Sequence, residues 1–215
     1  MPSLRQPGLF EALSGCERVL IAGAGGGFDV YAGLPLALQL RADGVQVHLA
    51  NLSFADLTAL DLDVWLAPDL AAIGPDTKGL DDYFPERTLA QWLHLRGLPA
   101  TVYAFPKTGV QPLRQAYRVL VERLRADAVV LVDGGTDILM RGDETGLGTP
   151  EEDMASLASV AGAGRAGAAG HLPGVRRRRP PRRQPRPGAG EPRRARPRRG
   201  VPGCPVDPRG LAAGP

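Results

Sequence analysis

The chain has 215 residues, a formal net charge of +3 and 43% hydrophobic side chains. These averages hide a change in composition, because residues 1–157 hold 12 Lys and Arg against 21 Asp and Glu, whereas residues 158–215 hold 14 Arg against two acids. Arg, Pro, Gly and Ala fill 46 of the last 58 positions, a composition that cannot bury a core. The sequence excludes a single fully folded 215-residue domain, a disulfide scaffold, because it has two Cys, and a membrane span, because no apolar run is long enough.

The first elements form the clearest architectural pattern in the chain. Arg18–Ala22 is a short apolar run that predicts a strand, and the glycines that follow it predict a tight turn. A helix is expected over 34–42, with Pro35 in its first turn and Gly44 as its left-handed terminator. Alternating residues then predict a strand over 45–51, which completes a right-handed βαβ unit.

The middle of the chain is less regular. Ser53 and Asp56 suit a short capped helix, and we expect 68–84 to be a long loop, a lid or binding loop, with a small helix as the alternative. Further elements are predicted in this order: a helix over 86–96, a strand over 100–105, a helix carrying Leu113, Tyr117, Leu120 and Leu124 on one face, a strand over 128–132, and a helix that starts at Pro150 after an N-cap at Thr149.

Alternating strands and helices indicate an α/β fold, a Rossmann-like three-layer domain with a mainly parallel sheet. Four strands are expected by residue 133, and no fifth follows the helix that starts at Pro150. We therefore predict an α/β domain over 1–158 that is incomplete at its C-terminal end, followed by a disordered tail rich in Arg, Pro, Gly and Ala over 159–215.

The loop GAGGGFD, residues 23–29, is the first candidate site. Backbone N–H groups of glycines between a strand and a helix can approach phosphate or carboxylate oxygens. The candidate ligand-binding residues of this loop are Gly23, Gly25, Gly26, Gly27 and Asp29. A NAD site is not expected, since the third position of the G-x-G-x-x-G fingerprint falls on Phe28 and no acid ends the second strand. The alternative is that the glycines serve only the turn.

The stretch DGGTD, residues 133–137, is the second candidate. The candidate residues are Gly134, Gly135 and Thr136 for a ligand and Asp133 and Asp137 for a metal. Carboxyl ends of parallel strands share one edge, so this stretch and the Gly-rich loop should meet if their strands are neighbours at the switch point. Asp29 with Asp133 or Asp137 could then hold Mg²⁺, our candidate cofactor. The alternative is that Asp29 and Asp137 cap local turns.

Acidic residues crowd the stretch 141–153. The helix start accounts for two of them, with Glu152 as a capping-box acid. Arg141, Asp143 and Glu144 remain, and we expect them in a solvated loop, with an active-site loop as the alternative.

The motifs GAGGGFDVYAGLPLALQL at 23–40 and VDGGTDILMRGDETGLGTPEEDMAS at 132–156 resemble the family known as domain of unknown function 1152. The resemblance covers roughly residues 15–158. It implies a prokaryotic α/β protein without an established activity, with further folded elements after the helix that starts at Pro150.

The tail allows two interpretations. Its Arg runs are typical of segments that bind RNA. A frameshift explains it better, because Arg, Pro, Gly and Ala are the residues whose codon families begin with two G or C bases, and Lys, Tyr and Phe are absent from this segment.

These observations predict a cytoplasmic protein that binds an anionic or phosphorylated small molecule, with nucleotides among the candidates, at the two loops. An enzyme would be an Mg-dependent transferase or hydrolase. The alternatives are a non-catalytic ligand sensor at the same loops and, if the tail is genuine coding sequence, a nucleic-acid-binding protein. Neither a membrane partner nor a particular oligomeric state is predicted.

Overall fold

A computed structural model describes residues 8–80, 83–141, 143, 148 and 150–163 of the chain. The tail is predicted to begin at residue 159, whereas the helix that starts at Pro150 continues to Ala163. The rest of the predicted tail and the predicted N-cap Thr149 lie outside the described residues. The strands are β1 Arg18–Gly23, β2 Gln46–Leu52, β3 Trp65–Ala67, β4 Leu70–Ile73, β5 Val102–Phe105 and β6 Ala128–Val132. The α-helices are α1 Gly8–Leu13, α2 Asp29–Ala32, α3 Leu34–Ala42, α4 Pro85–Leu95, α5 Val110–Leu124 and α6 Pro150–Ala163. The 3₁₀ turns are η1 Leu57–Ala59, η2 Leu62–Val64 and η3 Asp137–Leu139.

The strands form one sheet in the order β3-β4-β5-β2-β1-β6. β5, β2, β1 and β6 run parallel, whereas β4 pairs antiparallel with β5, and β3 pairs antiparallel with β4. The predicted mainly parallel α/β sheet is confirmed. The chain adds strands on one side of β1 and then returns to its other side with β6, so the switch point lies between β1 and β6.

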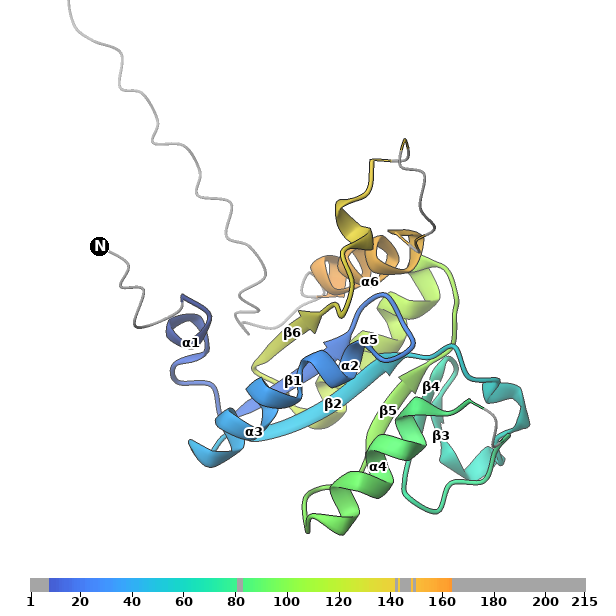
Figure 1. Cartoon of the computed structure of the whole chain (residues 1–215), viewed down its shortest axis with the longest axis horizontal. Helices are drawn as coiled ribbons and strands as arrows, with labels where there is room; N and C mark the ends of the chain where they lie inside the picture. The colour runs from blue at the N-terminus through green and yellow to red at the C-terminus, as the bar shows by residue number, and fades with distance from the viewer. Residues whose placement is uncertain (1–7, 81–82, 142, 144–147, 149, 164–215) are drawn as a thin grey trace, which may run out of the picture. The chain divides into compact units, whose positions relative to one another are not determined.

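Helices cover both faces of the sheet, which makes three layers (Figure 1). Successive side chains of β1 alternate between the faces. Val19 and Ile21 pack in one core with residues of α3 and α4, whereas Leu20 and Ala22 pack in the other with residues of α5. The strands are apolar along nearly their whole length because both faces of the sheet are covered.

The first βαβ unit forms as the sequence predicts. Pro35 lies in the first turn of α3, where its missing N–H costs no helical hydrogen bond. Gly44 ends the helix with a φ of +86°, a conformation that favours glycine. The predicted apolar stripe of α5 is also confirmed, since Leu113, Tyr117 and Leu120 are fully buried.

The prediction of a long loop over 68–84 is wrong for its first part, and the sheet has two strands more than the four expected. β3 and β4 form a short hairpin whose turn includes Asp69 at a φ of +60°. Ala71 and Ile73 of β4 pack in a third small core with Phe84. Strands of three and four residues are too short to show a period in the sequence.

Two smaller elements complete the fold. Asp56 caps η1 by accepting a hydrogen bond from the Thr58 N–H at 3.0 Å, close to the predicted short helix. The helix α1 was not predicted. In the part of the chain that the structure describes, no helix is both long enough and apolar enough to cross a membrane.

Candidate functional site

The two candidate loops meet at the switch point of the sheet. β1 ends at Gly23, which pairs with Val132 at the end of β6. The N–H of Ala24 then donates to the carbonyl of Val132 at 2.9 Å, so the strands stay together as the loops begin. The two loops lie side by side because β1 and β6 are neighbours in the sheet. From the sequence alone, the meeting of the loops could be predicted only on the condition that their strands are neighbours.

Asp29, the first residue of α2, joins the two loops. Its Oδ2 accepts a hydrogen bond from the Gly25 N–H at 2.7 Å, and its Oδ1 accepts one from the Gly134 N–H at 3.1 Å. The turn-capping role that was the alternative for Asp29 is therefore present in the structure. The same bonds hold its carboxylate at the junction of the two loops.

The Gly-rich loop is buried and needs its glycines for close packing. A Cβ at Gly23 would lie 2.6 Å from the backbone nitrogen of Val30 and would also collide with Asn51. Gly26 and Gly27 have φ values of +98° and +63°, which L side chains rarely adopt. The loop therefore has its shape for structural reasons, whether or not a ligand uses its amides.

The second loop is tightly turned and more exposed. Asp133 accepts a hydrogen bond from the Gly135 N–H at 2.7 Å, the pattern of an Asx turn. Thr136 is exposed. Asp137 starts η3, and its carboxylate lies close to the backbone of Gly135 and Gly148.

Three carboxylates converge where the loops meet. Asp29, Asp133 and Asp153 each place an oxygen so that the three atoms lie within 4.8 Å of one another. We call these three residues the carboxylate cluster. Asp137, a predicted metal residue, lies beside the cluster and is outside this group of three. Asp153 comes from α6 and was not predicted as a site residue.

Asp153 is the most constrained member of the carboxylate cluster. It is 1% exposed, and its Oδ1 has no hydrogen-bond partner among the described residues. Burial, and after it the charges of Asp133, Asp29, Asp137 and Glu152, together raise its pKa to about 6.

The pKa of Asp29 is also raised. Burial is the largest cause, and the charge of Asp133 acts in the same direction. The hydrogen bonds from the backbone of Gly134 and Gly25 oppose both effects, because they stabilise the ionised form.

Helix α6 carries Asp153 into the site and is fixed there by polar contacts. The hydroxyl of Ser156 donates to the carbonyl of Ala24 at 2.6 Å. Glu152 is 4% exposed and forms an ion pair with Lys107, which follows β5. Asp153 and Ser156 are three residues apart and so lie on one face of the helix, a spacing that could have pointed to their common environment.

Two buried polar side chains, Asn51 and Glu86, support the Gly-rich loop. The side-chain amide of Asn51 donates to the carbonyl of Gly27 at 2.8 Å and to Oε1 of Glu86 at 2.7 Å. Asn51 and Glu86 are both fully buried, and burial raises the pKa of Glu86. Glu86, the second residue of α4, was not predicted as part of the site, because no sequence pattern distinguishes it from an ordinary acid in the first turn of a helix.

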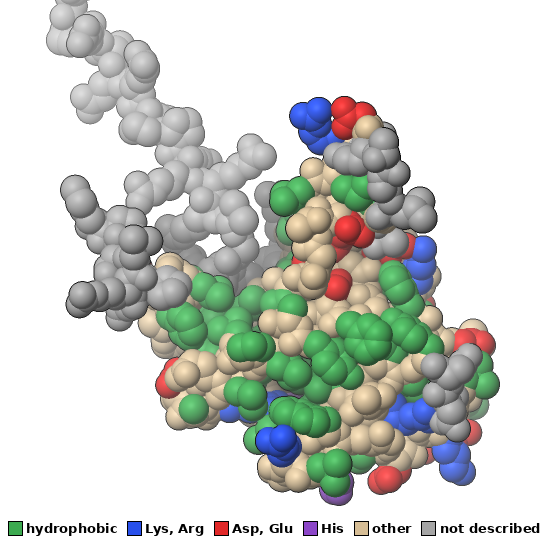
Figure 2. Space-filling model, in the orientation of Figure 1, with side chains coloured by type: hydrophobic (Ala, Val, Ile, Leu, Met, Phe, Trp, Pro, Cys, Tyr) green, Lys and Arg blue, Asp and Glu red, His purple; other side chains and the backbone are tan. Residues whose placement is uncertain are grey.

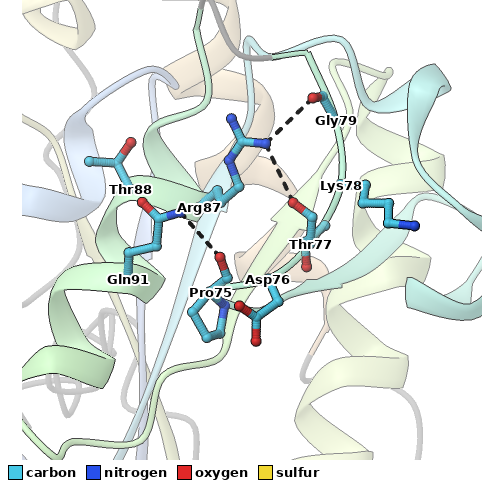
Figure 3. A pocket seen from close by; sticks show the side chains of 8 residues that line it. All are labelled: Pro75, Asp76, Thr77, Lys78, Gly79, Arg87, Thr88 and Gln91. Atoms are coloured by element: carbon cyan, nitrogen blue, oxygen red, sulfur yellow. Dashed lines mark hydrogen bonds between the residues drawn. The ribbon is translucent and has the colours of Figure 1, made fainter.

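A separate pocket of about 560 Å³ lies between the chain after β4 and α4 (Figure 3). Its polar groups largely bond to one another. Arg87 donates to the carbonyls of Thr77 and Gly79, both at 3.4 Å, and Gln91 donates to that of Pro75 at 3.2 Å. The last residue of β4 pairs with the first residue of β5, so this chain segment leaves the sheet at the edge opposite the carboxylate cluster. We therefore place the candidate site at the cluster.

Comparison with known proteins identifies a family and no closer relative. The profile of the family described as "Protein of unknown function (DUF1152)" matches residues 65–175, which include Asp133, Asp137 and Asp153 and begin after the Gly-rich loop. Searches of the curated proteins and of the solved structures give no match. The profile spans more than half of the chain, and the chain therefore belongs to the DUF1152 family.

Proposed function

We propose that the chain binds a divalent cation such as Mg²⁺ at Asp29, Asp133 and Asp153 and, through this cation, an anionic or phosphorylated small molecule. The observation that carries the proposal is the convergence of three carboxylates, one of which, Asp153, is almost completely buried and has an oxygen without a partner. Buried charges in proteins are paired or coordinate metals.

The chemistry of the donor set favours a hard cation. All three ligands are carboxylate oxygens, which suit Mg²⁺, Ca²⁺ and Mn²⁺ better than softer metals. Mg²⁺ is commonly held by one or two carboxylates together with substrate phosphates. A cation would also offset the mutual repulsion of the three aspartates, which contributes to the raised pKa of Asp153.

Direct binding of an anion by the glycine amides has less support. The N–H of Gly25 already donates to Asp29, and an anion beside the carboxylate cluster would be repelled by it. A bridging cation removes this conflict. The two loops keep their predicted role as the place of binding, with the carboxylates as the groups in contact with the cation.

The test is binding of Mn²⁺ alone to the full chain, measured by calorimetry. We expect saturable binding that Asp153→Asn weakens by about 10- to 100-fold, because the variant removes a ligand charge. Asp63→Asn is the matched control, since Asp63 is exposed in η2, and it should bind as the wild type does.

Inorganic pyrophosphate then tests the bridging role. We expect it to bind only in the presence of Mn²⁺. Equal Mn²⁺ binding by the wild type and Asp153→Asn would refute the cation site. Pyrophosphate binding without any cation would support direct contact with the loop amides and would also overturn the proposal.

Group transfer, hydrolysis and the sensing of a ligand would all use this same site. All three need the ligand to bind through the cation, so this binding is measured before any catalytic turnover.

A further inference from the structure

Three aromatic side chains surround the Gly-rich loop, and we call them the aromatic patch: Phe28, Phe54 and Tyr83. They come from the end of the loop, the chain after β2 and the chain before α4. Phe28 is 59% exposed, Phe54 43% and Tyr83 37%. Exposed aromatic side chains that gather in one place are typical of binding sites, whereas single ones are ordinary.

Two of the rings lie directly against the glycines of the loop. A Cβ at Gly26 would lie 2.6 Å from Cζ of Phe54, and a Cβ at Gly27 would lie 3.0 Å from the hydroxyl oxygen of Tyr83. The rings of Phe28 and Tyr83 meet edge to face, with centroids 5.7 Å apart and an interplanar angle of 87°. Edge-to-face contacts of this kind are favourable, so the rings are held while part of their surface stays in water.

The aromatic patch adjoins the carboxylate cluster. Phe28 directly precedes Asp29 in the chain, and the negative charge of Asp29 contributes to the raised pKa of Tyr83, after burial and Glu86. Figure 2 shows hydrophobic side chains gathered in the middle of one face, with acidic side chains exposed next to them. An aromatic surface therefore lies next to the carboxylate cluster.

A positive side chain, Lys107, lies beside the patch. The Nζ atom of Lys107 is 6.0 Å from the ring centroid of Phe54, and the same ammonium group pairs with Glu152, the neighbour of Asp153 in α6. The side chain of Lys107 is 60% exposed. The surroundings thus offer flat apolar rings, an ammonium group and a cluster that suits a cation.

We propose that the ligand is a nucleotide, whose base packs against Phe28, Phe54 and Tyr83 while its phosphates reach a divalent cation at the carboxylate cluster. This inference rests on the proposed function and adds the class of ligand to it. A nucleotide joins a flat heterocycle to a group that binds Mg²⁺, whereas a sugar phosphate or a simple anion would leave the rings in water. Stacking on aromatic side chains tolerates any base, so the patch alone does not select one base.

The experiment compares the four nucleoside diphosphates ADP, GDP, CDP and UDP with ribose 5-diphosphate, which lacks the base, in the presence of saturating Mn²⁺. We expect at least one of the four to bind the full chain about tenfold or more tightly than ribose 5-diphosphate. Phe28→Ala and Phe54→Ala should remove most of this advantage. Phe10→Ala in α1, which replaces an equally large and partly exposed ring, should change neither the nucleotide advantage nor the Mn²⁺ affinity.

The outcomes separate this inference from the proposed function. If Mn²⁺ binds as expected but ribose 5-diphosphate binds as tightly as all four nucleotides, the nucleotide assignment is overturned and the cation site stands. If Mn²⁺ does not bind, the proposed function is refuted, and the nucleotide assignment that rests on it is overturned as well. Phe28→Leu and Phe54→Leu keep the apolar volume, so an equal loss of the nucleotide advantage in these variants supports ring stacking, and full retention of the advantage refutes it.

Discussion

The carboxylate of Asp29 accepts a hydrogen bond from the backbone N–H of Gly134 at 3.1 Å, a contact between two loops that lie 105 residues apart in the sequence. The second oxygen of the same carboxylate accepts the N–H of Gly25 at 2.7 Å. One side chain therefore fixes the relative position of the loops that follow β1 and β6. The carboxylate cluster depends on this link, because Asp133 immediately precedes Gly134.

Replacing Asp29 should loosen this junction. We expect Asp29→Ala to lower the free energy of unfolding by about 2–3 kcal/mol in metal-free buffer, since two hydrogen bonds to a charged acceptor are lost and the N–H of Gly25 stays buried. Asp29→Asn keeps one acceptor oxygen and should lose about half as much. Urea denaturation measures both. A loss below 0.5 kcal/mol for the alanine variant, a threshold of about the size seen for ordinary surface substitutions, would show that other contacts hold the loops together.

A second prediction concerns the way α6 is attached to the Gly-rich loop. Ser156 is fully buried and donates to the carbonyl of Ala24 at 2.6 Å. Ser156→Ala leaves this carbonyl without its donor, so we expect about 1–2 kcal/mol of destabilisation. The matched control is Ser14→Ala, because Ser14 makes the same kind of bond, to the carbonyl of Glu11, on the surface. Equal urea midpoints for the two variants would contradict a special role for Ser156.

Local patterns predicted most of the parallel part of the fold. The bounds of α3 and the left-handed Gly44 follow from residues that are adjacent in sequence. β3 and β4 were not predicted, since their stability comes from the pairing of β4 with β5 and of β3 with β4, and not from their own periodicity. Short strands at the edge of a sheet depend on tertiary contacts that one sequence does not display.

The candidate site could be predicted in part. Both loops and the carboxylates of Asp29 and Asp133 could be named, because parallel strands end at the same edge. Asp153 could not be named from its surroundings, since an acid in the first turn of a helix is explained equally well by the helix dipole. Only the packing of α6 against α5 and the Gly-rich loop shows that Asp153 is buried.

A third prediction tests the closeness of the Gly-rich loop to the carboxylate cluster. A Cβ at Gly25 would collide with an oxygen of Asp153 and lie 2.8 Å from Oδ2 of Asp29. We expect Gly25→Ala to displace both carboxylates, to destabilise the fold by about 1–3 kcal/mol and to weaken Mn²⁺ binding by about tenfold or more. Gly109→Ala is the control, since Gly109 has open space around its Cβ position and a φ of −71°. Unchanged Mn²⁺ affinity in Gly25→Ala would place the cation elsewhere.

The last prediction is the pH dependence of stability in metal-free buffer. The folded-state pKa of Asp153 is about 6, raised first by burial, whereas an unfolded Asp titrates near pH ~3.9. Between these values the folded chain binds more protons than the unfolded chain, so the contribution of Asp153 to stability is fully present below the unfolded pKa and is lost as the pH rises through the folded pKa. We expect the free energy of unfolding to fall between pH ~4 and pH ~7.

Asp153→Asn should flatten this fall, because Asn does not titrate. Part of the slope should persist in the variant, since the pKa values of Asp29 and Glu86 are raised in the same direction. Asp63→Asn, in exposed η2, should run parallel to the wild type. Urea denaturation in EDTA at several pH values gives all three curves. If Asp153→Asn lost stability with rising pH as steeply as the wild type, the carboxylate of Asp153 would not be buried among the other acidic side chains.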